Sequence, residues 1–384
     1  MSAVLSGPSL SQRLRPFFRG FDGPLMLAIA WLTGVGLLCM YSAGYDHGTR
    51  FVDHARNFVL AFGVMFVVAQ VPPQKLMRVA VPLYVTGVVL LVAVALFGIT
   101  KKGATRWLDV GVVTLQPSEM LKTAMPLMLA WWFQRREGSL RLLDFIVAFV
   151  LLALPVMLVA KQPDLGTSLL VLGAGLYIIF FAGLSWKLII PVMVVALVGI
   201  TALVASEEKI CQPDVEWPMR EYQKNRVCTL LDPHKDPLGK GFHIIQGEIA
   251  IGSGGLTGKG FMQGTQTHLE FIPERTTDFI FAAFGEEFGF LGAMALLAGF
   301  TALIMRGLII ASDAPTLFGR LLAGAITMSF FTYVFVNMGM VSGILPVVGV
   351  PLPFISYGGT AMVSLGLALG MLMSIARSRG SVQR

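Results

Sequence analysis

Long apolar stretches recur along this chain from Gly23 to Ala376, and their length limits the folds that it can adopt. A membrane-spanning helix needs about 20 mostly apolar residues, because the hydrocarbon core is about 30 Å thick and a helix rises about 1.5 Å per residue. Segment 79–98 is one such stretch, and it lacks the alternation of a membrane barrel strand. Only 13% of the 384 residues are charged, against about 25% in a soluble domain.

We therefore expect an all-α polytopic membrane protein with about ten transmembrane helices, because backbone groups within lipid must bond to one another. The whole chain, 1–384, is predicted to form a single membrane domain. A long extracytoplasmic loop, about 206–277, is predicted between spans 7 and 8. The expected spans cover residues 23–43, 55–71, 79–98, 118–134, 142–160, 165–184, 187–205, 278–305, 321–341 and 357–376.

Lys and Arg are unevenly divided between the loops at the two ends of these spans. The loops on the N-terminal side carry 14 of them, and the short loops on the other side carry 6. Cytoplasmic loops are enriched in Lys and Arg, so both termini are predicted to be cytoplasmic and the long loop to be external. The net charge of +7 is thus a topology signal, and no nucleic-acid partner is expected.

The long loop carries two of the three cysteines, Cys211 and Cys228, which lie 17 positions apart. In an oxidising compartment they could pair as a disulfide. Two free thiols are the alternative, and the sequence leaves both open.

Spans 4, 6, 8 and 10 all run from outside to inside, and each begins with polar residues. Taken singly, these are ordinary helix starts, with Pro at the first position or Asp or Ser at the cap. Together they gather acids and cations on one external face of a chain that is poor in charge, and ionisable groups at membrane depth are usually functional. The charged residues concerned are Glu119, Lys122, Asp164, Glu274, Arg275 and Asp278.

Glu119 and Lys122 are three residues apart and share a helix face. They form either a simple ion pair or a site in which Glu119 positions Lys122 to bind an anion. Helix N-termini also favour phosphate groups, and Arg106 and Arg275 add positive charge nearby. These features indicate an external cavity for an anionic, lipid-linked substrate, with Asp278 as the best candidate for a base.

Other motifs are less informative. Residues 252–260 look like a phosphate-binding loop but lack its Gly and Ser/Thr positions, so we expect turns there. The histidines of the long loop have no partners at metal-ligand spacing, so a zinc site is not expected. Glu286 and Glu287 lie inside span 8, where they could line a polar interior or contact a partner chain.

The motifs together resemble the SEDS family (shape, elongation, division, sporulation) over residues 23–376, and its RodA branch in particular. Segments 243–246 and 259–266 favour that branch over the FtsW branch. Two positions depart from residues that are frequent in RodA-like sequences: Thr276 stands in place of His, and Gly247 in place of Ser. The first departure argues against an acid–base role for the side chain at position 276. The segments that carry the resemblance are 106–109, 116–119, 162–167, 273–282 and 353–360.

The resemblance implies a peptidoglycan glycosyltransferase that polymerises lipid II, an undecaprenyl-pyrophosphate-linked disaccharide peptide, during cell elongation and rod-shape maintenance. It implies the bacterial inner membrane as location, and as partners the class B penicillin-binding protein 2 and other elongation-complex membrane proteins. The family's catalytic carboxylate falls on Asp278. Cavity residues fall on Glu119, Lys122 and Asp164, with Arg56 and Arg106 as weaker matches.

The expected reaction is an inverting transfer, because the donor linkage is α and the polymer linkage is β. Asp278 would act as general base, and the departing pyrophosphate needs positive charge. Lys122, arginines such as Arg275, helix N-termini or a divalent metal (Mg²⁺ or Mn²⁺) could supply that charge. Two alternatives stay open at this stage, a lipid II flippase and a scaffold that only recruits a transpeptidase.

Overall fold

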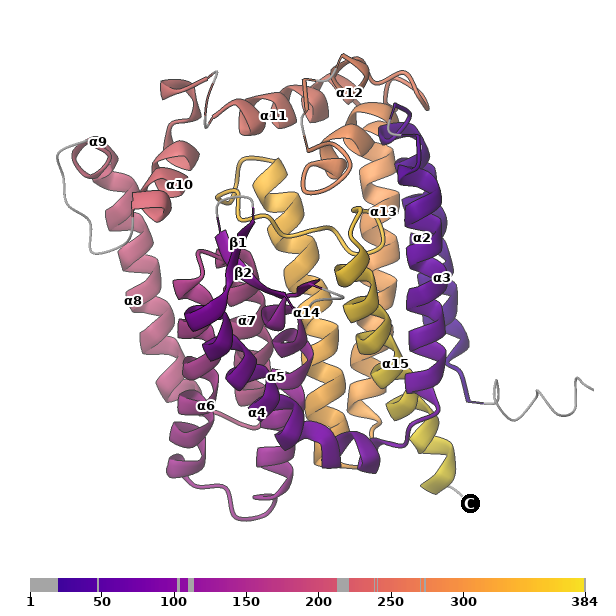
Figure 1. Cartoon of the computed structure of the whole chain (residues 1–384), viewed down its shortest axis with the longest axis vertical. Coiled ribbons are helices and arrows are strands. Elements are labelled where there is room, and N and C mark those ends of the chain that lie inside the picture. The colour runs from indigo at the N-terminus through magenta and orange to yellow at the C-terminus, as the bar shows by residue number, and fades with distance from the viewer. Residues whose placement is uncertain are drawn as a thin grey trace, which may run out of the picture.

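The structure is a computed structural model that describes residues 20–46, 48–101, 104–109, 114–212, 221–237, 239, 241–269, 271–272 and 274–382. Ten long helices within these residues form an all-helical bundle (Figure 1). Each of the ten predicted spans overlaps one of them. They are α2 (Gly23–Ala43), α3 (Arg50–Ala69), α4 (Pro73–Phe97), α5 (Pro117–Gln134), α6 (Leu142–Lys161), α7 (Leu165–Phe181), α8 (Trp186–Ala205), α13 (Ile280–Ser312), α14 (Leu317–Val341) and α15 (Gly359–Val382).

The lengths and composition of these helices confirm a multi-pass membrane protein. Among the described residues, eight helices are long and apolar enough to cross a membrane by themselves, and α7 is an apolar helix of 17 residues. The remaining long helix, α5, carries Glu119 and Lys122. The predicted span boundaries differ from the observed helix ends by up to seven residues, and one difference concerns the candidate base. Residues 274–279 form turns, because Thr277 N and Phe279 N both bond to Glu274 O, so Asp278 precedes α13.

Several helices begin where the sequence supplies a cap. Pro73 and Pro117 occupy the first positions of α4 and α5, where a missing N–H costs nothing. The side chains of Asp164 and Thr316 accept hydrogen bonds from the first turns of α7 and α14. The polar residues at these starts thus have a structural role in addition to any chemistry.

The helices pack closely on one another, with α15 against α3 and α13 against both α2 and α14. A side chain at Gly366 would overlap the carbonyl group of Ala61, so glycine allows α15 to approach α3. By contrast, α8 has no buried residue and stands at the edge of the bundle (Figure 1).

Short elements connect the helices. Strands β1 (Ile99–Lys101), β2 (Ala104–Asp109) and β3 (Thr114–Leu115) form an antiparallel sheet in the order β1-β2-β3, between α4 and α5. The long loop holds α9 (Glu207–Ile210), α10 (Glu221–Leu231), the 3₁₀ helix η1 (Pro233–Lys235), α11 (Phe242–Gly254) and α12 (Thr265–His268). In Figure 1, α11 and α12 lie across one end of the bundle.

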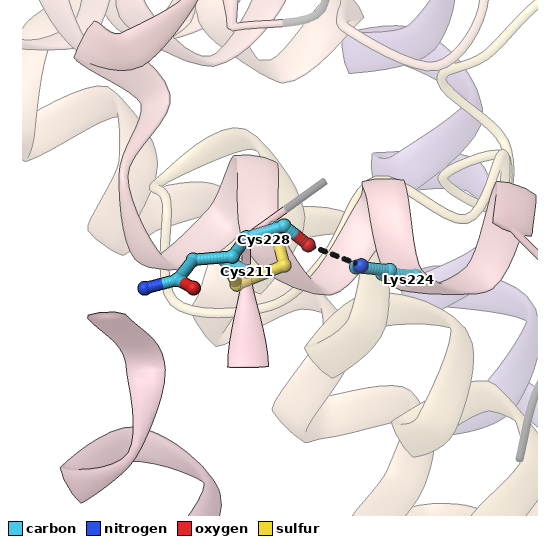
Figure 2. Close-up of a disulfide and its surroundings, with 4 residues drawn as sticks. Cys211, Lys224 and Cys228 are labelled. Atoms are coloured by element: carbon cyan, nitrogen blue, oxygen red, sulfur yellow. Dashed lines mark hydrogen bonds between the residues drawn. A yellow bond between two sulfur atoms is a disulfide. The ribbon is translucent and has the colours of Figure 1, made fainter. Parts of the chain in front are cut away.

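The structure pairs Cys211 with Cys228, which joins the end of α9 to α10 (Figure 2). Lys224 Nζ strengthens the same junction by donating a hydrogen bond of 2.6 Å to the carbonyl oxygen of Gln212. The third cysteine, Cys39, is buried in α2.

α13 is interrupted at Gly289, whose φ of 63° is in the region that favours glycine. The loop after α11 completes the break, because Phe290 N donates to Gly255 O (2.9 Å) and Leu291 N donates to Leu256 O (3.0 Å). Within the glycine-rich segment 252–260, residues 252–254 end α11 and the rest form the predicted turns against α13.

Candidate active site

The ion pair predicted in α5 is present. Nζ of Lys122 lies 2.6 Å from Oε1 of Glu119, and it faces the ring of Tyr333 on α14 at 5.6 Å from the centroid. The other carboxylate oxygen of Glu119, Oε2, is buried and has no hydrogen-bond partner among the described residues. Glu119 therefore holds Lys122 with one oxygen and keeps an acceptor available on the other.

Asp164, at the start of α7, joins three elements. Its carboxylate accepts hydrogen bonds from Thr167 N (3.1 Å) and Gln116 Nε2 (3.2 Å), and it lies 3.3 Å from Nη1 of Arg106. Nε of Arg106 is buried, and no described residue accepts a hydrogen bond from it. The Asp164–Arg106 pair therefore links β2, α5 and α7 and leaves one donor unpaired.

Asp278 is half-buried in the turn before α13. Its carbonyl oxygen accepts a hydrogen bond of 2.9 Å from Nδ2 of Asn337 on α14. Its carboxylate lies close to Gly349, where a Cβ atom would stand 3.3 Å from Oδ2. The loop between α14 and α15 thus borders the carboxylate.

That loop is joined directly to the residues before Asp278. Oγ of Ser356 donates to Thr277 O (2.7 Å), and Tyr357 N donates to Thr276 O (2.8 Å). From α3, Nη1 of Arg50 donates to Oγ1 of Thr276 (2.6 Å) and lies over the ring of Tyr357. Thr276 therefore accepts a bond in an interhelical junction, in line with the prediction that it has no acid–base role.

A cavity of about 80 Å³ lies between α5, α7, α14, α15 and the segment 351–356. Lys122 and Tyr333 line it on one side and Ser356 on another, while most of the remaining lining is apolar. Ser356, which lines the cavity, is bonded to the residue before Asp278, while Asp278 itself does not line the cavity. The arrangement combines a carboxylate, a buried ammonium group and an apolar chamber.

Comparison with known proteins identifies the family. The family model FTSW_RODA_SPOVE, described as cell cycle protein, matches residues 24–381. This chain belongs to that family. The peptidoglycan glycosyltransferase MrdB of Escherichia coli (strain K12) is 48% identical over 357 residues, which cover 92% of this chain and 93% of MrdB. The peptidoglycan glycosyltransferase RodA of Treponema pallidum (strain Nichols) is 30% identical over 420 residues, covering 92% and 97%.

Solved structures of the FtsW/RodA/SpoVE family share the fold. A chain from a peptidoglycan synthase complex, studied for the coordination of polymerization and crosslinking, aligns with a TM-score of 0.77 at 28% identity. The alignment covers 94% of this chain and 99% of that one. The rod shape determining protein RodA of Thermus thermophilus aligns with a TM-score of 0.68 at 26% identity, over 94% and 98%.

Two further residues predicted to bind substrate, Arg275 and Arg56, have partners within the chain. Arg275 is 4% exposed, and its guanidinium is paired with Asp46 and bonded to the carbonyl oxygen of Ala43 (3.1 Å). Arg56 is 68% exposed and pairs with Asp53 at 3.0 Å. Neither lines the cavity, and the same is true of Glu119, Asp164, Arg106 and Asp278. Arg275 instead anchors the segment before α13 to the end of α2, a role that its position in the sequence did not reveal.

The structure also adds residues that the sequence prediction missed. Tyr333 and Asn337 lie in α14, within a predicted span that is otherwise largely apolar, and Ser356 and Arg50 join the surrounding segments. A polar side chain in a span usually faces the bundle interior, so Asn337 could have been found by that signal. Ser356 and Arg50 become informative only once their distant partners are known.

Metal ligands were left open by the sequence. Within the part of the chain that the structure describes, no group of three or more His, Cys, Asp or Glu side chains is arranged to hold a metal ion. The positive charge that the described residues place at the cavity itself comes from Lys122.

Glu286 and Glu287 are both buried and are occupied within the chain. Glu286 accepts bonds from Lys259 Nζ (2.7 Å), Thr265 Oγ1 (3.0 Å) and Gln266 N (2.9 Å), and Glu287 accepts one from Ser42. Glu286 fixes the loop after α11 onto α13, and Glu287 joins α13 to α2.

Proposed function

We propose that this chain is a peptidoglycan glycosyltransferase that polymerises lipid II into glycan strands during cell elongation and rod-shape maintenance. Its relatives MrdB and RodA carry that activity in their names, at 48% and 30% identity. The observation that carries the proposal is one cavity lined both by Lys122, which pairs with Glu119, and by Ser356, which is bonded to the residue before Asp278.

In the proposed reaction, Asp278 acts on the acceptor sugar. The C4 hydroxyl oxygen of the acceptor attacks the anomeric carbon of the donor, and the hydroxyl proton passes to the carboxylate of Asp278. The bond between that carbon and the pyrophosphate oxygen breaks, and the pyrophosphate leaves with the electron pair. One displacement inverts the α linkage to β. General base catalysis of this kind typically contributes about 100- to 10,000-fold.

Lys122 supports the departing group. An ammonium group in an apolar chamber interacts strongly with developing negative charge, because little water screens it there. Glu119 holds Lys122 in place, and its unpaired Oε2 can accept a bond from a substrate hydroxyl or amide. Nε of Arg106 offers a donor to a phosphate or carbonyl oxygen beside Asp164.

The excess of Lys and Arg in the loops on the side of the N-terminus supports an inner-membrane topology with both termini cytoplasmic. The family model that matches residues 24–381 supports one membrane domain for the whole chain. This topology places the α9–α12 loop, and the chemistry, outside. The similarity to a chain of a peptidoglycan synthase complex supports a penicillin-binding partner, which we assign as the class B penicillin-binding protein 2 within the elongation complex.

A lipid II flippase is the alternative function. A flippase needs polar groups that serve both faces of the membrane. Here Glu119, Asp164 and Asp278 stand at or just before the starts of helices that, in the assigned topology, open on the same face. This asymmetry favours chemistry at the outer face over transport.

The test uses purified protein with fluorescent lipid II and Mg²⁺, with and without penicillin-binding protein 2 carrying an inactivated transpeptidase. Products are separated on a gel, and lipid II movement is measured in parallel in vesicles. Glycan ladders support polymerisation. Movement of lipid II across the bilayer without glycan ladders, under conditions where E. coli MrdB is active, would contradict polymerisation and indicate that the chain transports lipid II.

A further inference from the structure

Asn337 is a fully buried polar residue near the end of α14, with 0% of its surface exposed. Its Nδ2 donates two hydrogen bonds, one to Asp278 O (2.9 Å) and one to Val350 O (2.7 Å). An amide nitrogen has two hydrogens, so both donors are used, and they fix the orientation of the side chain. Asn337 thereby joins three segments: α14, the turn before α13, and the loop before α15.

The two carbonyl groups that Asn337 binds belong to the two segments that meet at the Asp278 carboxylate. One belongs to Asp278 itself. The other belongs to Val350, which follows Gly349, and Gly349 is where a Cβ would lie 3.3 Å from Oδ2 of Asp278. Gly349 has a φ of 73°, so its backbone adopts a conformation that other residues rarely accept. The spacing between the two segments decides how the carboxylate lies against Gly349.

We infer that Asn337 is a positioning residue for Asp278, which sets the distance between the carboxylate and the loop at Gly349. The inference rests on the proposed role of Asp278 as base. Other bonds hold the neighbours of Asp278, since Ser356 binds Thr277 O and Tyr357 N binds Thr276 O. The bond from Asn337 is made at residue 278 itself.

The amide of Asn337 has both a cost and a benefit. Its Oδ1 is buried without a hydrogen-bond partner among the described residues, and an unsatisfied buried acceptor costs free energy. A leucine of similar size would avoid that cost but would remove the donor to Asp278 O and Val350 O. The benefit of the amide therefore lies in its two donor bonds, which hold Asp278 and Val350 against α14.

Loss of these bonds should affect turnover more than substrate binding. A displacement of about 1 Å at a reacting group can lower a rate about 100-fold. We expect Asn337→Leu to reduce kcat for lipid II polymerisation by that factor, with KM unchanged. The matched control is Thr327→Val, because Thr327 is equally buried on α14 but bonds within its own helix, to Ala323 O.

A second readout reports position independently of activity. Cys39 is buried and Cys211 is bonded to Cys228, so in a Cys39→Ala background an Asp278→Cys variant provides one accessible thiol. The rate at which a small charged methanethiosulfonate modifies that thiol depends on how accessible the thiol is and on the charges around it. Adding Asn337→Leu should change this rate several-fold, and adding Thr327→Val should not.

The outcomes separate this inference from the proposed function. If Asn337→Leu changes neither kcat nor the thiol rate while Asp278→Asn is inactive, positioning by Asn337 is wrong and the role of Asp278 stands. If Asp278→Asn polymerises lipid II normally, the proposed role of Asp278 as base is wrong. The modification rate of the thiol then still shows whether Asn337 determines the position of the side chain at residue 278. A lowered Tm with normal kcat and thiol rate would show a merely structural residue. If Asn337→Leu does not fold, Asn337→Ser, which keeps one donor, is used with the same criteria.

Discussion

The carboxylate of Glu286, early in α13, accepts a hydrogen bond of 2.7 Å from Nζ of Lys259, which lies in the loop after α11. Glu286 has 0% of its surface exposed and also accepts bonds from Thr265, Gln266 and Thr267. A single buried carboxylate thus holds the loop that covers the break in α13.

Glu286→Gln should loosen this loop, because an amide presents a donor where the carboxylate accepts. Breaking a buried charged pair costs roughly 3 kcal/mol. We expect a lower Tm in detergent and faster proteolysis within 255–268. The control is Glu137→Gln, since Glu137 is 48% exposed and its pair with Arg320 is loose at 4.0 Å. Equal Tm and proteolysis in the two variants would contradict the assigned role.

Arg275→Gln should lower stability without changing the KM for lipid II. Arg275 is buried, and its partners Asp46 and Ala43 belong to the end of α2 and the turn after it. Its loss leaves those groups unsatisfied, at a cost of about 3 kcal/mol. Thermal unfolding and steady-state polymerisation are measured together, with the half-exposed Arg320→Gln as control. A raised KM of Arg275→Gln at normal stability would support the prediction that Arg275 binds substrate.

Much of the fold was predictable from local sequence, and the site only in part. The apolar stretches predicted all ten long helices, and the cap motif at Asp164 placed the start of α7. The ion pair of Glu119 and Lys122 followed from their i, i+3 spacing. These features depend on residues that are close along the chain.

The features that were missed depend on partners far apart in the sequence. Arg50 and Thr276 are bonded across 226 positions, and Arg275 pairs with Asp46 across 229. Arg275 was predicted to bind substrate because it is a cation in the expected external cluster. Its burial against α2 could not be seen without the packing of α2 on α13.

The disulfide should be detectable by mass spectrometry of unreduced protein as a peptide that joins Cys211 to Cys228. Closing a loop of this length stabilises the segment by about 3 kcal/mol in the chain-entropy description. Cys211→Ser should therefore increase proteolysis near α10, whose Arg226 donates a bond of 2.8 Å to Val347 O. Alkylation of both cysteines without reductant would contradict the pairing.

Lys122→Met should lower kcat by roughly 100-fold or more, as loss of one transition-state donor typically does. The variant also leaves Glu119 without its partner, so the double variant Glu119→Gln, Lys122→Met is needed. If the ammonium group itself is required, the double variant stays inactive. Recovery of polymerisation in the double variant would show instead that the unpaired carboxylate caused the loss. Lys75→Met, at an exposed position in the first turn of α4, is the control.

The most direct test compares wild type, Asp278→Asn and the Glu137→Gln control in polymerisation of fluorescent lipid II, after confirming equal Tm. The substitution keeps the size of the side chain and removes its basicity. We predict glycan ladders from wild type and the control and none from Asp278→Asn, a loss of about 100-fold or more. Ladders of equal intensity from Asp278→Asn would contradict the assignment of Asp278 as the base.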